Sequence, residues 1–143
     1  MILVDTNILI DVLKADPVWL PWSAQHLMLA RQAGPMFVNY VVYAELNTHE
    51  GTAAQADAML DDLGIAICEL TRESARIAAR AFRQYRNRGG NKSGVLPDFF
   101  IGAHAQAEGW KLLTRDAARY KTYFPRLKLI CPWTCSWSVT NRA

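Results

Sequence analysis

The sequence predicts an α/β fold with a central parallel sheet, because short apolar runs alternate along the whole chain with segments of helical periodicity. The apolar runs have the length and composition of strands and cover residues 2–4, 36–38, 65–70, 111–114 and 127–131. The helical segments between them cover residues 8–14, 22–33, 40–49, 53–63, 72–87, 98–108 and 117–123. Strands that alternate with helices run parallel, since each helix returns the chain to the same starting edge of the sheet.

Helix start and stop signals support these boundaries in chain order. Asn39 and Thr71 are each a suitable N-cap for the helix that follows, because their side chains can accept from backbone N–H groups of the first turn. Thr52 is followed three residues later by Gln55, which is the spacing of a capping box. Glycine follows three of the helical segments, as is typical of helix ends, at positions 34, 64 and 109.

The 143 residues are enough for one domain, which we expect to span residues 1–132, followed by a tail of uncertain structure at 133–143. No apolar run approaches the roughly 20 residues of a membrane-spanning helix, and the N-terminus lacks a signal-peptide pattern, so no membrane association is expected. The chain has three cysteines, an odd number that suits a reducing cytoplasm. The C-x3-C spacing at 131–135 is only a weak zinc signal.

Four acidic residues are expected at one edge of the sheet. Asp5 ends the first strand, and Asp116 stands just past the fourth. Glu45 lies about a turn and a half into the helix after the second strand, and Asp98 stands at a helix start. Ligands of open parallel sheets collect beyond the carboxyl ends of the strands, so these side chains should converge there. Converging carboxylates repel unless a divalent cation binds them, and oxygen ligands favour Mg²⁺ or Mn²⁺ over zinc.

Each of these residues taken alone has a simpler explanation. Asp5 can be a turn or cap residue, Asp98 a helix-start acid, and Glu45 part of a solvated helix face. Thr6 and Asn7 can cap the first helix or orient Asp5, and capping is the favoured role for Asn7. The hypothesis of a metal site therefore depends on the set and not on any single residue.

Four short motifs resemble those of a known family. They are VDTNILID with Asp5, YAEL with Glu45, LPDFFIGAHA with Asp98, and LLTRDAARYKTYFP with Asp116. In order and spacing they are similar to the four acidic motifs of PIN-domain ribonucleases, and more narrowly to those of VapC toxins of type II toxin–antitoxin systems. The resemblance covers nearly the whole chain, and the tail 133–143 is the part that matches nothing in it.

The resemblance implies a three-layer α/β/α sandwich and a cytoplasmic endoribonuclease that depends on one or two Mg²⁺ or Mn²⁺ ions. It implies that the catalytic and metal-binding acids are Asp5, Glu45, Asp98 and Asp116, of which the last is the most variable in the family. Thr114 carries over as a polar helper, and its hydroxyl would point into the site if the register of its strand is as expected. The implied partners are an RNA substrate, a cognate antitoxin protein and a second copy of the chain in a homodimer.

Basic residues are concentrated in one segment of the chain. Residues 72–92 contain seven Lys and Arg against one acid, although the net charge of the chain is only +3. In the expected helix 72–87, arginines and apolar residues fall on different faces. We therefore predict an RNA-binding surface made of Arg76, Arg80, Arg83, Lys92 and Arg115. A merely solvated helix face is the alternative explanation.

Other function classes are weaker. Phosphatases similar to haloacid dehalogenases also end a strand with Asp, but they place a second Asp two residues later, where this chain has Asn7. A nucleotide-binding fold is disfavoured because no G-x-G-x-x-G or Walker loop follows any strand. The main alternative is a non-catalytic PIN-like module that binds RNA or protein, although all four acids are present.

Overall fold

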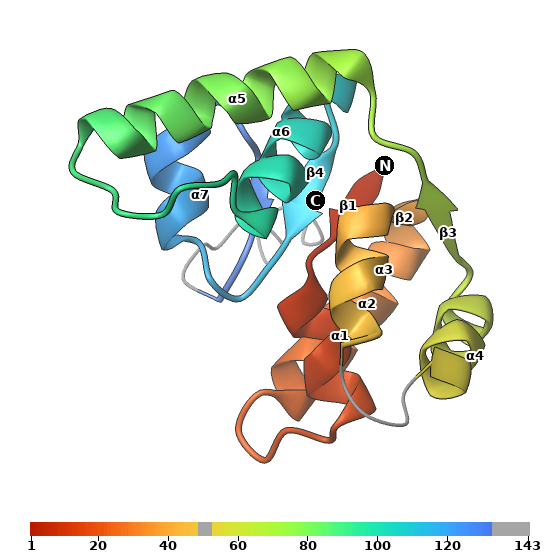
Figure 1. Ribbon diagram of the computed structural model, residues 1–143. Helices are drawn as coiled ribbons and strands as arrows, with labels where there is room; N and C mark the ends of the chain where they lie inside the picture. Colours follow the sequence, from red (N-terminus) through yellow and green to blue (C-terminus); the bar gives the residue numbers. More distant parts are fainter. Residues whose placement is uncertain (49–52, 133–143) are drawn as a thin grey trace, which may run out of the picture.

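A five-stranded parallel sheet lies at the centre of the computed structural model, which describes residues 1–48 and 53–132 (Figure 1). The strand order is β3-β2-β1-β4-β5, and every neighbouring pair is parallel. The strands are β1 (Ile2–Val4), β2 (Met36–Asn39), β3 (Ile65–Cys68), β4 (Lys111–Leu113) and β5 (Leu129–Ile130). The helices are α1 (Thr6–Leu13), α2 (Leu20–Ala33), α3 (Tyr40–Leu46), α4 (Ala53–Leu63), α5 (Arg72–Asn87), α6 (Pro97–Glu108) and α7 (Ala118–Tyr123).

Helices cover the sheet on both sides. The chain crosses the sheet in one direction from β1 to β3 and in the opposite direction from β3 to β5. Because connections between parallel strands are right-handed, the helices of these two halves fall on opposite faces. Figure 1 shows α1, α2 and α3 gathered on one side of the strands and α5, α6 and α7 on the other. The predicted α/β/α sandwich with a central parallel sheet is therefore confirmed.

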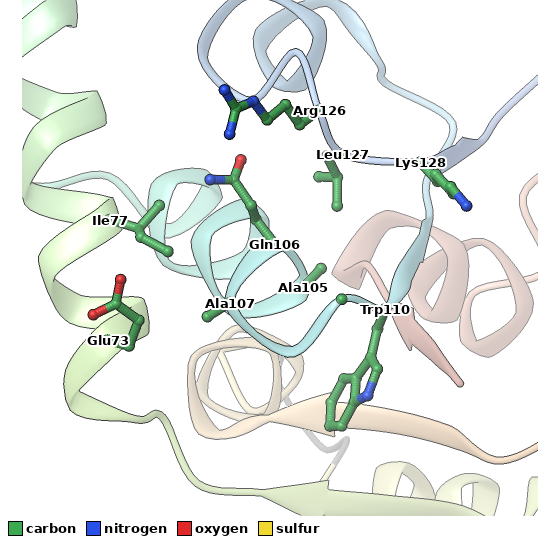
Figure 2. Close-up of a pocket in the computed structure, with 10 residues that line it drawn as sticks. Glu73, Ile77, Ala105, Gln106, Ala107, Trp110, Arg126, Leu127 and Lys128 are labelled. Carbon is green, nitrogen blue, oxygen red and sulfur yellow. The ribbon is translucent and has the colours of Figure 1, made fainter.

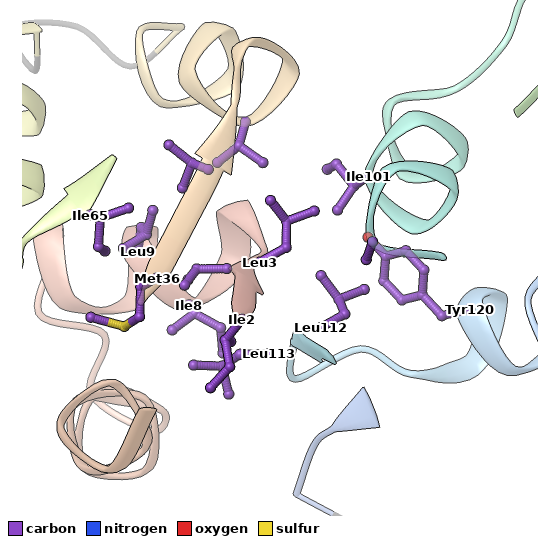
Figure 3. Close-up of a cluster of buried hydrophobic side chains, with 14 of the residues drawn as sticks. Ile2, Leu3, Ile8, Leu9, Met36, Ile65, Ile101, Leu112, Leu113 and Tyr120 are labelled. Carbon is purple, nitrogen blue, oxygen red and sulfur yellow. The ribbon is translucent and has the colours of Figure 1, made fainter. Parts of the chain in front are cut away.

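The central strands form the core of the molecule. Leu3 and Val4 in β1, and Leu112 and Leu113 in β4, are fully buried. Strands that are covered on both faces read as continuous apolar runs, which is how these two segments appear in the sequence. Figure 3 shows their side chains packed with residues of β2, α1 and α6 in one cluster. The edge strand β3 differs, because its Ile67 is exposed.

Two helices begin two residues earlier than the sequence predicts. α1 begins at Thr6 because Asp5, and not Asn7, is its N-cap and accepts the Thr6 N–H at 2.7 Å. The expectation that Asn7 caps the first helix is therefore wrong. α2 begins at Leu20 with Pro21 in its first turn, where proline is favoured because no intrahelical partner exists for its missing N–H.

The other helix ends agree with the sequence signals. Asn39 accepts the Val42 N–H at 3.0 Å at the start of α3. Thr71 caps α5 in a capping box whose other member is Ser74. Gly109 ends α6 with a φ of 69°, in the left-handed region that glycine adopts without strain.

Some expectations fall on residues that the structure does not describe. These are the capping box at Thr52 and everything expected of the tail 133–143, which includes Cys135 of the weak zinc signal. The domain boundary at residue 132 therefore stays a prediction. No helix within the described ranges is both long enough and apolar enough to cross a bilayer.

Candidate active site

A cavity of about 250 Å³ lies beyond the carboxyl ends of β1 and β4. Four separate parts of the chain contribute a carboxylate to its wall: the residue after β1, the last turn of α3, the first turn of α6 and the segment between β4 and α7. These residues are Asp5, Glu45, Asp98 and Asp116. The other wall residues are Thr6, Asn7, Ile10, Arg115 and Tyr120. The structure thus brings the four acids of the sequence motifs to one cavity, while their roles in binding metal and in catalysis stay predictions.

Asp5 is the most deeply buried of the four acids, with an exposed fraction of 4%. Its Oδ1 accepts the N–H of Thr6 at 2.7 Å. Its Oδ2 accepts the hydroxyl of Thr114 at 2.8 Å and the hydroxyl of Tyr120 at 2.9 Å. The amide of Asn7 donates to the same oxygen at 3.5 Å. These donors fix both carboxylate oxygens at the end of β1.

Burial raises the pKa of Asp5 to about 7. The hydrogen bonds from Thr114 and Tyr120 oppose this rise, while the negative charge of Asp98 adds to it. Burial likewise raises the pKa of Glu45 and of Asp98, and the charge of a neighbouring acid adds to each rise. Such shifts arise when several carboxylates share a poorly solvated space, and a bound cation would reverse them.

Thr6 links two of the acids. Its backbone N–H binds Asp5, and its hydroxyl donates to Oε1 of Glu45 at 2.7 Å. Because Thr6 opens α1 and Glu45 lies in α3, this one residue sets the spacing between the end of β1 and the side chain of a different helix.

Thr114 is fully buried and its hydroxyl points into the site, as the register of its strand predicts. The hydroxyl donates to Asp5, and it accepts from the Asp116 N–H at 3.1 Å and from the Asn7 amide at 3.3 Å. Thr114 therefore connects the segment that carries Asp116 to the buried carboxylate. Asn7, which fails as a helix cap, is part of this same network.

Tyr120 is a site residue that the sequence analysis missed. It lies in α7, is almost fully buried, and donates its hydroxyl to Asp5. Burial holds the pKa of this phenol well above its usual range, so it remains a donor. α7 can approach α6 closely because residue 102 is glycine: a Cβ there would lie 2.6 Å from the Phe124 ring and 3.0 Å from the Tyr120 ring. The only feature of the sequence that could have indicated Tyr120 as a site residue is its position four residues after Asp116, which is about one helical turn.

Arg119 was also missed. Its Nη1 lies 3.3 Å from Oδ2 of Asp98, in an ion pair whose side chains are both partly exposed. Its guanidinium also lies over the rings of Tyr85 and Phe99. The positive charge of Arg119 opposes the burial effect on the pKa of Asp98.

The predicted RNA-binding residues do not gather in one place. Arg115 lines the acidic cavity, but its Nε is paired with Asp11 at 2.8 Å. The remaining four, which are Arg76, Arg80, Arg83 and Lys92, are exposed and are not among the described residues that form the cavity wall. Their part in RNA binding stays a prediction.

The donor chemistry of the cavity fits a hard divalent cation. Within residues 1–48 and 53–132, no three His, Cys, Asp or Glu side chains stand close enough together to enclose a metal ion. Mg²⁺ does not need such a cage, because it keeps several waters and is commonly held through one or two carboxylates. Four carboxylates around a cavity of about 250 Å³ provide these ligands and leave space for water.

A second cavity is larger but chemically different. It measures about 420 Å³ and lies between α5, the C-terminal end of α6 and residues 126–128 (Figure 2). Among the described residues that line it, Glu73 alone is acidic, and Arg126 and Lys128 are its cations. This cavity lacks a set of carboxylate ligands, so size alone does not identify the site.

Comparison with known proteins places these motifs in a family. The family model described as PIN domain matches residues 2–125. The fold is similar to that of VapBC2 from Rickettsia felis bound to a promoter DNA fragment, with a TM-score of 0.70 and 21% identity over 92% of this chain and 99% of that one. DNA-bound VapBC from Salmonella typhimurium gives a TM-score of 0.68 and 15% identity over 91% and 96% of the two chains.

A toxin–antitoxin complex from Klebsiella pneumoniae is similar to the same extent. Its TM-score is 0.65, with 23% identity over 93% of this chain and 98% of that one. No curated protein sequence matches the chain closely enough to count as a relative. At these identities the likeness to solved structures concerns the fold.

Proposed function

The chain belongs to the PIN domain family, and from this membership we propose that it is a metal-dependent endoribonuclease that acts in the cytoplasm as the toxin of a toxin–antitoxin pair. The observation that carries the proposal is the single cavity to which four separate elements each bring a carboxylate. A carboxylate cluster beyond the ends of parallel strands can hold the cations that phosphodiester hydrolysis uses.

Asp5, Glu45, Asp98 and Asp116 would hold one or two Mg²⁺ or Mn²⁺ ions. When bound, such an ion supplies an activated water and stabilises negative charge on the phosphate oxygens. The protein's own contribution is orientation: Thr114 and Tyr120 donate to Asp5 Oδ2 and fix that carboxylate, while Thr6 fixes Glu45. Preorganised groups of this kind cost no rearrangement during the reaction.

The proposed reaction is hydrolysis of an RNA phosphodiester. The oxygen of a water forms a bond to phosphorus, the bond from phosphorus to the 3′ oxygen breaks, and that oxygen takes up a proton. The products are a 5′-phosphate and a 3′-hydroxyl, and the 2′-hydroxyl of the RNA takes no part. The raised pKa of Asp5, about 7, means that cation binding must displace a proton from this carboxyl at neutral pH.

A cognate antitoxin is the proposed protein partner, and a homodimer is the proposed assembly. The similar structure from Klebsiella pneumoniae is a toxin–antitoxin complex, and that from Rickettsia felis is VapBC2 on promoter DNA. The two matches cover 93% and 92% of this chain, respectively. Co-purification with the product of an adjacent small gene would test the partner. Light scattering of the chain alone would test the dimer.

Cleavage of RNA by the purified chain tests the proposed activity. We expect cleavage in Mg²⁺ or Mn²⁺ and none in EDTA, and we expect Asp5→Asn to remove it. Asp61→Asn is a matched control, because Asp61 is an exposed acid that is not part of the described cavity wall. Cleavage that persists in EDTA would exclude the metal role. RNA or protein binding without cleavage under any condition would favour the non-catalytic PIN-like module instead.

A further inference from the structure

Arg115 differs from the other basic residues in its ion pairing. It lies in the wall of the cavity that holds four carboxylates, but it forms its ion pair with Asp11, which is not one of them. It lines the cavity with Asp5, Glu45, Asp98 and Asp116. Its Nε nevertheless donates to Oδ2 of Asp11, on the second turn of α1, at 2.8 Å. An arginine beside so many acids would be expected to fold onto them, so the pairing with Asp11 needs an explanation.

Asp11 is buried, and its side chain is fixed by hydrogen bonds. Its exposed fraction is 1%, whereas the side chain of Arg115 is 30% exposed. The hydroxyl of Ser23 in α2, which is itself fully buried, donates to the same Oδ2 of Asp11 at 2.7 Å. A buried carboxylate is stable only when it is paired and hydrogen-bonded, so Asp11 requires the arginine as a counter-charge.

The guanidinium of Arg115 is fixed on a second side as well. Its central carbon lies 5.4 Å from the ring centroid of Trp19, the residue that precedes α2. Its backbone N–H donates to Asn7 Oδ1 at 3.4 Å. Within the described ranges, no protein group accepts from its two terminal nitrogens, Nη1 and Nη2. Among the described residues, the terminal pair of donors, which arginine can use for phosphate, therefore has no partner.

We propose that Arg115 binds a phosphate of the RNA strand beside the acidic cavity, and that Asp11 is the positioning residue that holds it there. The inference rests on the proposed nuclease function and extends it. A carboxylate-rich cavity repels the polyanion that it must receive, and a fixed cation at its wall offsets that repulsion. Asp11 also keeps Arg115 from pairing with the four acids, which leaves their oxygens for a cation.

A purely structural role makes different predictions. The Asp11–Arg115 pair also joins α1, α2 and the segment after β4, so removing either partner should lower stability in any case. A structural pair alone would leave the affinity for RNA unchanged in protein that remains folded. The test must therefore measure binding, with thermal unfolding as an independent check on the fold.

Binding is measured by fluorescence anisotropy of a short fluorescein-labelled single-stranded RNA, in Mg²⁺ and in an Asp5→Asn background that prevents cleavage. We expect Arg115→Ala to raise Kd about tenfold and to reduce the slope of log K against log salt by roughly one, as loss of one phosphate contact requires. Arg31→Ala is the control with no expected effect, because Arg31 binds the Asp62 carbonyl on the surface of α2.

Asp11→Asn separates positioning from direct contact. We expect a smaller rise in Kd than for Arg115→Ala, and no further rise when Asp11→Asn is combined with Arg115→Ala, because Asp11 acts only through the arginine. If Asp11→Asn does not fold, Ser23→Ala replaces it, since Ser23 holds the same carboxylate oxygen.

Three results would overturn the inference: an unchanged Kd and salt slope in Arg115→Ala, additive effects in the double variant, or no measurable RNA binding by the parent protein. Failure of the proposed nuclease function appears elsewhere, as absence of cleavage by the unmodified chain in Mg²⁺ and Mn²⁺. RNA binding that depends on Arg115 would support the phosphate contact even in that case.

Discussion

Two charged regions of the molecule differ in how their charges are arranged. One is the acidic cavity, and the other is the basic face of α5, which is formed by the exposed residues Arg76, Arg80 and Arg83. In the cavity, carboxylates from distant parts of the chain are brought together, and burial raises the pKa of three of them, Asp5, Glu45 and Asp98. On α5, helical periodicity alone spaces like charges along a solvated surface. The cavity therefore costs stability when no cation is bound, whereas the basic face costs little.

The difference indicates which region depends on exact geometry. The function proposed for the cavity would depend on Asp5 being held by Thr114 and Tyr120, which donate to it at 2.8 and 2.9 Å. The RNA attraction predicted for the basic face would require only charge, which acts over a Debye length of about 10 Å. Substitutions should consequently have large, specific effects at the first region and small, salt-dependent effects at the second.

The largest expected effect is on stability. We expect the unfolding free energy of the metal-free protein to fall as pH rises from about 4 to about 7, because the folded chain keeps a proton on Asp5, with a pKa of about 7, that the unfolded chain releases near 3.8. This contribution is on the order of 4 kcal/mol and levels off above pH 7. Chemical denaturation in EDTA at several pH values measures it.

The same pH profile has an internal control. Asp5→Asn should make the fall smaller, since asparagine does not titrate while Glu45 and Asp98, whose pKa values are also raised, remain. Mg²⁺ should stabilise the unmodified chain most above pH 7, where the carboxylates are ionised. A metal-free profile that stays flat between pH 4 and 7 in the unmodified chain would contradict the buried-carboxylate account.

The next largest effect concerns catalysis. We expect Asp98→Asn to lower kcat/KM for RNA about a hundredfold, which is a typical loss when one charged group is removed from a catalytic centre. It also removes the ion-pair partner of Arg119. A kinetic series in Mg²⁺, with Asp61→Asn alongside, measures the loss, and equal activity of the two variants would argue against Asp98 as a site residue.

A moderate effect is expected from Tyr120→Phe. Loss of the hydroxyl removes a hydrogen bond that lowers the pKa of Asp5, so that pKa should rise and the acid limb of the pH–rate profile should move to higher pH. Activity should fall about tenfold, in the range for residues that orient a metal ligand. Tyr43→Phe is the matched control, because the Tyr43 hydroxyl binds the exposed Asp57. An unmoved profile would show that Tyr120 only fills space.

The smallest effect is expected on α5. The double change Arg80→Glu and Arg83→Glu should raise KM a few-fold and flatten its salt dependence, with little change in kcat, because neither residue is part of the described cavity wall. Initial rates at several salt concentrations measure this, with Arg31→Glu as the control for general charge reversal. A large fall in kcat would mean that the basic face reaches the reacting centre.

The sequence predicted the fold well because its signals are local. Apolar runs, Asn39, Thr71 and the helix-end glycines mark strands and helix ends without any knowledge of packing. The convergence of the acids also followed from a general rule, since parallel strands end at one edge. Asn7 was favoured over Asp5 as the cap of α1 because Asp and Asn are equally good N-caps, and only the geometry of the turn decides between them.

The contacts that complete the site could not be predicted in this way. Tyr120 reaches Asp5 only because α7 packs closely on α6, and the pairing of Arg115 with Asp11 depends on how α1 and the segment after β4 meet. Such contacts join residues more than a hundred positions apart in sequence and carry no periodic signal. The α5 arginines gave a strong local signal, yet that signal does not locate them relative to the acids.

The glycine at position 102 gives a way to disturb the site without altering any charge. A methyl group there would collide with the rings of Phe124 and Tyr120, so Gly102→Ala should push α7 outward and draw the phenol away from Asp5. The outer surface of α1 and α2 would be untouched. Such a variant should lose the orientation of Asp5 while every charge of the cavity stays in the chain.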